Sequence, residues 1–200
     1  NGKELLILTN QSAPNYKVVA IEPGKPFAQA KIIVPEKSEV LQSAATGGGK
    51  LFCSYLKNAC TEVSQFDLDG KNEVKIELPG LGTASGFHSK ANQNSFYYTF
   101  TSFTYPSTIF KYDISSGKSS LYKKAEVKFN PADFVTEQVF YTSKDGTKVP
   151  MFITYKKGMK LNGNNPTLLY GYGGFNISIT PSFSISNIVF LENGGVYCVA

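Results

Sequence analysis

The stretch Leu168–Pro181, LLYGYGGFNISITP, decides how the C-terminal part of this chain is interpreted. Its apolar start predicts a buried strand that ends in a glycine-rich loop. Three glycines in that loop, at positions 171, 173 and 174, allow the backbone to turn sharply and to approach a ligand closely. Pro181 stands where the first turn of a helix tolerates proline, so we expect a helix to begin there. A buried strand, a glycine loop and a helix in this order indicate an α/β unit.

The residues on both sides of this stretch extend the same unit. Apolar runs at Val139–Thr142 and Val149–Tyr155 flank the pair Asp145-Gly146, which predicts a hairpin with a tight turn. Beyond the loop, residues 195–200 predict a second buried strand. A hairpin, a strand, a helix and a strand form the opening of an α/β sheet.

The helix expected between the two buried strands has one apolar face. That face is formed by Ile185, Ile188 and Val189. Gly194 follows at the position where a C-terminal stop is expected.

Roughly the first 125 residues carry an internal repeat. Each unit begins with an apolar run and continues with a second strand that ends in a Gly-Lys turn. The Gly-Lys pairs are 46 and 47 residues apart, which is typical of propeller blades of about 40 to 50 residues. Apolar and polar residues alternate within the units, which predicts strands. The runs are Leu5–Leu8, Leu51–Leu56 and Phe96–Phe100, and the pairs begin at Gly24, Gly70 and Gly117.

This repeat predicts about three blades of a β-propeller. A propeller typically closes its ring with about 4 to 8 blades, so an arc of three leaves strand edges uncovered. The chain also begins at Asn1 without an initiator methionine and ends within an expected strand. We therefore expect it to be a piece of a larger protein.

The composition disfavours a nucleic-acid-binding role. The net charge is +5, but all 20 basic residues are lysine, so the planar fork that contacts guanine or clamps phosphate is missing. The lysines are dispersed and form nothing longer than doublets. We expect a mildly basic, solvated surface and no nucleic-acid partner.

Cys53, Cys60 and Cys198 have neither metal-ligand spacing nor the pattern of a disulfide framework, so we expect buried free thiols. No apolar run approaches the roughly 18 residues of a bilayer-spanning helix, and no signal peptide precedes the first strand. We expect no membrane partner, no metal and no cofactor. The expected location is cytoplasmic, with the periplasm as the alternative.

Two weak motif matches and the single histidine carry no chemistry. The nearest approach to a Gly-x-Ser-x-Gly elbow is the segment 82–86, where the serine stands one position late. The segment 46–50 lacks the first glycine and the final Ser/Thr of a phosphate-binding loop, so we interpret it as a turn between blades. His88, the only histidine, is interpreted as a surface or packing residue.

The order of these parts resembles the prolyl oligopeptidase family of serine peptidases. Thr101–Phe103, Ser143–Phe152 and Tyr170–Pro181 carry the resemblance, and the last is by far the most specific. The family implies a seven-bladed propeller that caps a Ser-Asp-His α/β-hydrolase. The expected fold is mainly β with a start of α/β: about three blades of seven, then the first strands of an α/β-hydrolase sheet. The expected domains are residues 1–130, a partial propeller, and residues 131–200, the N-terminal portion of the hydrolase domain.

The resemblance also implies an activity, the cleavage of short peptides on the carboxyl side of proline. It implies that the Tyr172 hydroxyl stabilises the oxyanion, where most α/β-hydrolases use a backbone N–H from this loop. It implies that Phe175 lines the pocket for the proline ring, against which a flat aromatic face packs well. Without the resemblance, Tyr172 as an ordinary interfacial tyrosine and Phe175 as a core residue are the simpler interpretations.

Serine, aspartate and histidine follow the oxyanion loop in the chain order of α/β-hydrolases, so all three are expected beyond Ala200. We expect residues 1–200 alone to be inactive. The expected partners are short proline-containing peptides and the remainder of the protein's own chain. The alternative is a non-catalytic β-propeller that acts as a peptide-binding or interaction module.

Overall fold

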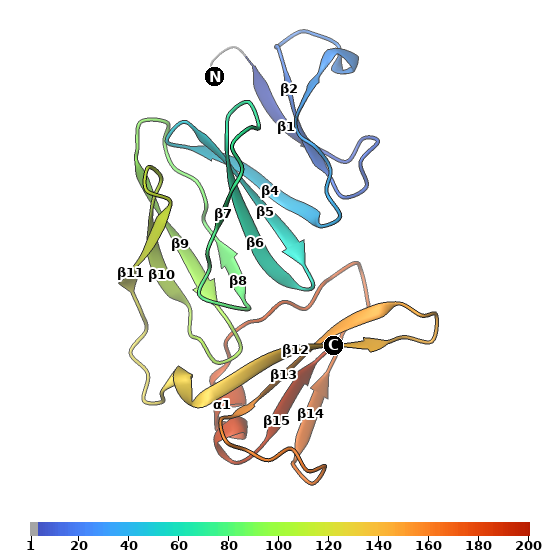
Figure 1. Cartoon of the computed structure of the whole chain (residues 1–200), viewed down its shortest axis with the longest axis vertical. Helices are drawn as coiled ribbons and strands as arrows, with labels where there is room; N and C mark the ends of the chain where they lie inside the picture. The colour runs from blue at the N-terminus through green and yellow to red at the C-terminus, as the bar shows by residue number, and fades with distance from the viewer. Residues whose placement is uncertain (1–3) are drawn as a thin grey trace.

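The structure, a computed structural model, describes residues 4–200 and contains, within that range, four β-sheets and one α-helix (Figure 1). Three antiparallel sheets follow one another along the chain, and the fourth sheet lies below them in Figure 1. The first sheet holds β1 (Leu5–Thr9), β2 (Lys17–Ile21) and β3 (Lys31–Val34), with the 3-10 turn Phe27–Gln29 between the last two. The prediction of a mainly β fold is confirmed.

The second and third sheets have four strands each, which are hydrogen-bonded in chain order. The second sheet holds β4 (Val40–Gly47), β5 (Lys50–Lys57), β6 (Cys60–Asp67) and β7 (Val74–Ile76). The third holds β8 (Thr83–Ser85), β9 (Ser95–Thr101), β10 (Thr108–Asp113) and β11 (Lys118–Lys123).

The Gly-Lys repeat is confirmed at the level of backbone conformation. Gly24, Gly70 and Gly117 have φ angles of +83°, +81° and +67°, a region that favours glycine. They lie between β2 and β3, between β6 and β7 and between β10 and β11, so each turn precedes the last strand of its sheet.

The prediction that an apolar run begins each unit is wrong for the second and third sheets. Leu51–Leu56 and Phe96–Phe100 belong to β5 and β9, which are the second strands of their sheets. The strands before them went unnoticed because β8 has three residues and β4 is mostly polar or small. The turn at Gly48-Gly49 therefore joins β4 to β5 within one sheet and does not connect two blades.

Face-to-face packing of the sheets forms the main core. Phe52 of β5 packs edge-on against Phe96 of β9, with ring centroids 4.9 Å apart. Tyr112 of β10 is fully buried in the same cluster, and its hydroxyl donates a hydrogen bond of 3.0 Å to Oε1 of Gln65 in β6. The second and third sheets therefore share both an apolar core and a buried polar tie.

The fourth sheet combines antiparallel and parallel pairing. In the order β12-β13-β15-β14, the two ends of the sheet are the strands β12 and β14. Strands β14 and β15 are parallel, and α1 lies between them in the chain and packs on β13 and β15. The elements are the 3-10 turn Pro131–Asp133, β12 (Phe134–Thr142), β13 (Lys148–Lys156), β14 (Thr167–Tyr170), α1 (Ile185–Glu192) and β15 (Val196–Val199).

Within this sheet, the hairpin that turns at Asp145-Gly146 and the buried last strand are confirmed. The prediction that Thr167–Tyr170 is buried is wrong, since all four residues are exposed. Strand β14 is the edge of the sheet, and α1 packs over β13 and β15 instead of covering it.

The helix also differs from its prediction. It begins at Ile185, after Ser184, and not near Pro181. Its buried residues are Ile188 and Leu191, whereas Ile185 is 57% exposed, because only one narrow face of this short helix meets the sheet. Gly194, with a φ of +83°, ends the helix as predicted. Within residues 4–200 there is no helix long and apolar enough to span a membrane.

Two of the repeated glycines predict different costs of adding a methyl group. A Cβ at Gly70 lies 1.8 Å from the carbonyl oxygen of Ile33 in the first sheet, whereas a Cβ at Gly24 meets nothing within 4 Å. We expect Gly24→Ala to cost about 1 kcal/mol of unfolding free energy, for the positive φ alone. Gly70→Ala should cost about 1–3 kcal/mol more, because the clash pushes two sheets apart.

Urea unfolding of both variants and the parent protein measures this difference. Equal losses for Gly24→Ala and Gly70→Ala would show that the turn after β6 does not pack tightly against the first sheet.

Candidate functional site

The glycine loop 171–176 begins where β14 ends, at the carboxyl end of a strand that pairs in parallel with β15. Its start is held by a hydrogen bond of 3.0 Å from the Ala200 N–H to the Tyr170 carbonyl oxygen. Its end is closed by a bond of 3.1 Å from the Ile177 N–H to the Gly174 carbonyl oxygen. The loop is thus a defined turn at the place where ligands bind in parallel sheets.

Two consecutive non-glycine residues of this loop have left-handed backbone conformations. Phe175 and Asn176 have φ angles of +53° and +55°. A bulky residue pays for such a conformation, and residues held in this way are concentrated at functional sites. The backbone conformation therefore indicates a functional site in this loop, independently of its side chains.

The loop presents Tyr172 and Phe175 to solvent, but in different ways. The Phe175 side chain is 92% exposed and Tyr172 is 44% exposed. The Tyr172 hydroxyl folds back over the loop, where a Cβ at Gly174 would lie 3.2 Å from it. Glycine at position 174 therefore leaves room for this tyrosine. The interpretation of Phe175 as a core residue is wrong, since its ring projects freely, whereas the roles implied for both residues stay predictions.

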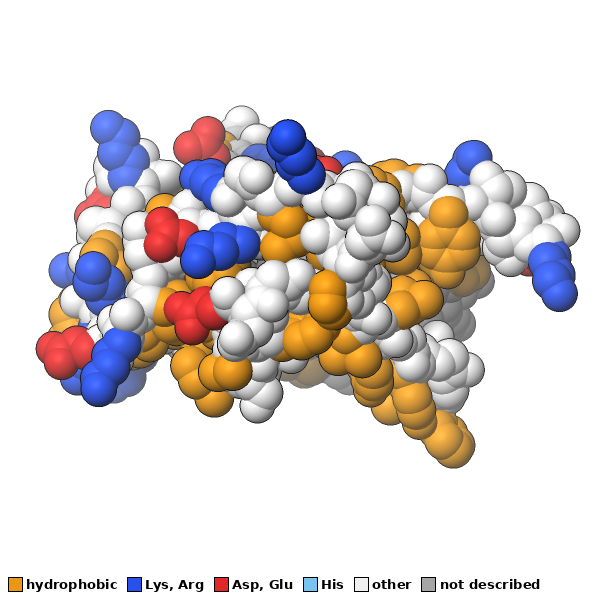
Figure 2. All heavy atoms as spheres, turned by 90° about the horizontal axis from the view of Figure 1, so that it is seen from below, with side chains coloured by type: hydrophobic (Ala, Val, Ile, Leu, Met, Phe, Trp, Pro, Cys, Tyr) orange, Lys and Arg blue, Asp and Glu red, His pale blue; other side chains and the backbone are white. Residues whose placement is uncertain are grey.

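The segment that contains the loop is uncharged and exposes many apolar side chains. Residues 161–191 contain no Asp, Glu, Lys or Arg. Seen from below, the molecule shows hydrophobic side chains gathered in the middle and toward the lower right of the view, whereas charged side chains lie mostly to the left (Figure 2). The exposed apolar residues of this region are Leu161, Leu168, Leu169, Tyr170, Tyr172, Phe175, Ile177, Ile185 and Val189. An exposed apolar surface of this kind is typical of a binding or contact surface.

After the loop, the chain passes along the junction between the fourth sheet and the three antiparallel sheets. Phe103, which follows β9, is buried there against Phe152 of β13, with ring centroids 5.3 Å apart. Tyr197 of β15 meets the same ring edge-on at 5.8 Å. Cys60 and Val199 complete this junction core, and Ile179 packs against it.

Two side-chain hydrogen bonds also cross the junction. The Thr83 hydroxyl in β8 donates a bond of 2.7 Å to the carbonyl oxygen of Pro181. The Gln138 amide in β12 donates a bond of 2.7 Å to the carbonyl oxygen of Asn58, in the turn between β5 and β6. The residues that follow the glycine loop are therefore connected to the third sheet by both apolar and polar contacts.

An open cavity of about 440 Å³ lies beside the junction, between the β5–β6 hairpin, the chain after β7 and Gln138 of β12. Cys60 is among its lining residues, and burial raises the pKa of its thiol to about 11. A thiol with that pKa is almost wholly protonated near pH 7, so it is a poor nucleophile. No sequence pattern predicted this cavity, because its walls come from three separate parts of the chain.

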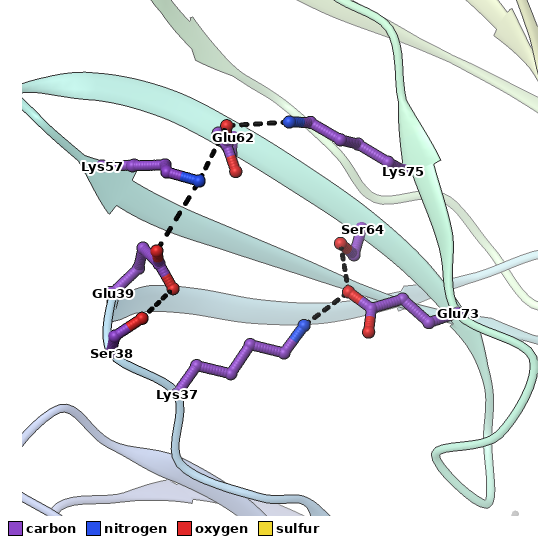
Figure 3. A network of polar contacts seen from close by, with 8 residues as sticks. All are labelled: Lys37, Ser38, Glu39, Lys57, Glu62, Ser64, Glu73 and Lys75. Atoms are coloured by element: carbon purple, nitrogen blue, oxygen red, sulfur yellow. Dashed lines mark hydrogen bonds and ion pairs between the residues drawn. The ribbon is translucent and has the colours of Figure 1, made fainter.

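Both lysines that line this cavity are paired with glutamates (Figure 3). Lys57 lies 3.7 Å from carboxylate oxygens of both Glu39 and Glu62, and Lys75 lies 2.7 Å from Glu62. Exposed pairs of this kind contribute little free energy, typically about 0–1 kcal/mol each. With both lysines paired, the cavity has no strong attraction for an anionic ligand.

No other cluster suited to catalysis stands out in residues 4–200. That range has no group of three or more His, Cys, Asp or Glu side chains that could hold a metal ion. His88 is exposed and lies between β8 and β9. Cys53, Cys60 and Cys198 are free and buried.

The family model described as the prolyl oligopeptidase N-terminal β-propeller domain matches residues 1–125. The prolyl endopeptidase of Elizabethkingia meningoseptica is 49% identical over 200 residues, which cover all of this chain and 28% of that protein. The prolyl endopeptidase of Dictyostelium discoideum is 38% identical over 211 residues and is likewise covered over 28% of its length.

Solved structures show the same likeness. A structure from a mechanistic analysis of two prolyl endopeptidases has a TM-score of 0.91 and 46% identity, covering 98% of this chain and 29% of that one. Prolyl oligopeptidase B from Galerina marginata, bound to a 25mer macrocyclization substrate, has a TM-score of 0.86 and 31% identity, covering 100% of this chain and 28% of that one. The chain therefore spans less than a third of the length of the relatives that it matches.

The junction core predicts a large effect of truncating its central ring. Phe103→Ala removes a side chain that is 2% exposed, so it should lower the unfolding free energy by about 3–5 kcal/mol. Phe140→Ala in β12 deletes the same atoms from a residue that is 50% exposed and should change it by about 0.5 kcal/mol or less. Chemical denaturation compares the two, and similar losses would show that Phe103 does not hold the junction.

Proposed function

The chain belongs to the prolyl oligopeptidase family, and from that membership we propose that it is part of a serine endopeptidase that hydrolyses short peptides on the carboxyl side of proline. Its relatives carry the name prolyl endopeptidase, and the chain spans 28% of the length of two of them. The activity proposed is that of the whole protein, to which these residues contribute part of the substrate site.

We assign residues 1–130 to a partial propeller and residues 131–200 to the start of the hydrolase domain. The family model supports the first assignment, since it matches residues 1–125. The second rests on the fourth sheet, in which a parallel pair is connected through α1 and continues an antiparallel hairpin. On this assignment, the exposed β14 edge and the apolar surface around it contact the remainder of the protein.

The observation that carries the proposal is the glycine loop at the carboxyl end of β14, with its left-handed Phe175 and its exposed Tyr172. In peptide hydrolysis, a serine oxygen attacks the scissile carbonyl carbon, and the carbonyl oxygen takes up negative charge. A donor held in place before the reaction stabilises that charge without reorganisation. We assign this role to the Tyr172 hydroxyl, which donates its hydrogen to the oxyanion, while serine, aspartate and histidine come from outside residues 1–200.

Phe175 serves substrate selection in the same proposal. Its ring is almost fully exposed and lies three residues from Tyr172, so a substrate can cover its face. A proline ring packed on that face buries apolar area from both partners and supplies affinity without charge. The uncharged surroundings of the loop suit an apolar side chain next to the scissile bond.

Replacing Tyr172 by phenylalanine tests the oxyanion role. In the protein expressed from the complete reading frame that encodes these residues, Tyr172→Phe should lower kcat about 10²- to 10³-fold, the cost of one lost oxyanion donor. KM should change little, because the donor acts in the transition state. Hydrolysis of a fluorogenic glycyl-prolyl peptide measures both constants.

The matched control is Tyr170→Phe, which removes a hydroxyl from a tyrosine of similar exposure, 46%, two residues away in β14. It should keep the parental kcat. An active protein in which Tyr172→Phe also keeps that kcat would contradict the role. A protein with no hydrolytic activity at all would favour the interaction-module alternative.

Replacing Phe175 by alanine tests the pocket role. Phe175→Ala should lower kcat/KM for a prolyl substrate about tenfold or more, since the buried area of an aromatic ring is lost. The loss should be much smaller for a matched substrate with alanine in place of proline. Phe27→Ala, in the 3-10 turn between β2 and β3, removes the same atoms far along the chain and should leave the hydrolysis of both substrates unaffected. Equal losses for the prolyl and alanyl substrates would rule out a proline pocket.

A further inference from the structure

We propose that Thr83, in strand β8 of the third sheet, is a positioning residue for the glycine loop, so that a propeller strand determines where the Tyr172 hydroxyl lies. The inference rests on the oxyanion role proposed for Tyr172. It assigns to the propeller a part in catalysis that is separate from binding the substrate. The contact that carries it is the hydrogen bond of 2.7 Å from the Thr83 hydroxyl to the Pro181 carbonyl oxygen, between residues 98 positions apart.

Thr83 lies in a short strand, and the residues next to it in the chain are fixed by hydrogen bonds. The Ser102 hydroxyl donates a bond of 2.7 Å to the Leu81 carbonyl oxygen. Thr61 of β6 bonds on both sides of Thr83, donating its N–H to the Gly82 carbonyl oxygen at 3.0 Å and accepting from the Ala84 N–H at 3.1 Å. These bonds tie β8, the edge strand of the third sheet, to β6 of the second sheet.

Close backbone packing adds to this rigidity. A Cβ at Gly82 would lie 2.4 Å from the ring of Phe100 and 2.4 Å from the carbonyl oxygen of Thr101, so the strand is pressed directly against β9. Thr83 itself pairs with Thr101 in the β8–β9 ladder. A side chain on so constrained a backbone points in one direction, which is what a positioning group needs.

The glycine loop is anchored at its two ends. At the start, Tyr170 is bonded to Ala200 within the fourth sheet. Beyond its end, Ile179 packs against the junction core. Pro181 is buried, and its carbonyl oxygen accepts the bond from the Thr83 hydroxyl. Among residues 4–200, the bond from Thr83 is the one hydrogen bond that joins the segment 171–184 to the three antiparallel sheets.

Removing the hydroxyl leaves the buried Pro181 carbonyl oxygen without that donor, and the segment can then shift to find another. Small displacements of a catalytic group are costly, because the donor must lie within about 2.7–3.1 Å of the developing charge. A weaker anchor should therefore lower the rate of the chemical step more than it lowers substrate affinity.

The test is Thr83→Val, which keeps the shape of the side chain and removes its hydroxyl. In the protein from the complete reading frame, kcat per folded active site should fall about three- to tenfold, with KM nearly unchanged. Thr83→Ser should restore most of the loss, because it returns the donor. Active-site titration corrects for any unfolded fraction.

The matched control is Thr101→Val, its partner across the ladder. The Thr101 hydroxyl donates a bond of 3.0 Å to the carbonyl oxygen of Tyr105, in the turn between β9 and β10, and does not reach the glycine loop. It should lower stability by a similar amount and leave kcat at the parental value. Equal effects of Thr83→Val and Thr101→Val on kcat would reduce the Thr83 bond to a general structural role and overturn the proposal.

A double variant distinguishes the positioning role of Thr83 from the oxyanion role of Tyr172 on which it rests. In a Tyr172→Phe background there is no hydroxyl to position, so Thr83→Val should change kcat less than about twofold. If Tyr172→Phe slows hydrolysis but Thr83→Val multiplies fully with it, the positioning role is wrong and the oxyanion role stands. If Tyr172→Phe has no effect, or the protein has no activity, both proposals fall.

Discussion

The packing of the second sheet against the third forms the rigid base of the molecule. Phe52, Phe96 and Tyr112 fill the space between the two sheets, and Tyr112 is bonded to Gln65 across it. Burying several aromatic rings supplies most of the favourable free energy, while the hydrogen bond fixes how the sheets are oriented. With the two sheets fixed together, Thr61 of one can bond to the strand β8 of the other.

The junction with the fourth sheet builds on that rigid base. Phe103 leaves the third sheet and enters the core formed by Phe152 and Tyr197, so an apolar contact joins the sheets without a shared strand. The segment after the glycine loop crosses the same place, where Ile179 packs against the junction core and the Pro181 carbonyl oxygen accepts the bond from Thr83. The loop that we propose to act on substrate is therefore held by both the fourth sheet and the third sheet. Its conformation depends on how these two sheets pack against each other.

Much of the architecture could be predicted from local patterns. The Gly-Lys pairs, spaced 46 and 47 residues apart, predicted three repeats. The signal is present in the sequence because each turn has a glycine with a positive φ at the same place in its sheet. The apolar runs Val139–Thr142 and Val149–Tyr155, on either side of the Asp145-Gly146 turn, predicted the β12–β13 hairpin, and Gly146 likewise has a positive φ. By contrast, β4 and β8 were missed, since their residues are stabilised by neighbouring strands and not by their own composition.

The glycine loop has some features that its local sequence specifies and others that depend on packing against distant segments. The apolar residues before the loop and its three glycines predicted that a strand ends there in a loop, because apolar runs and glycine positions are local features of the sequence. The exposure of β14 and of Phe175, the late start of α1 and the bond from Thr83 to Pro181 were decided by tertiary structure. Each depends on which surface lies opposite, and residues 98 positions apart leave no local trace of their contact.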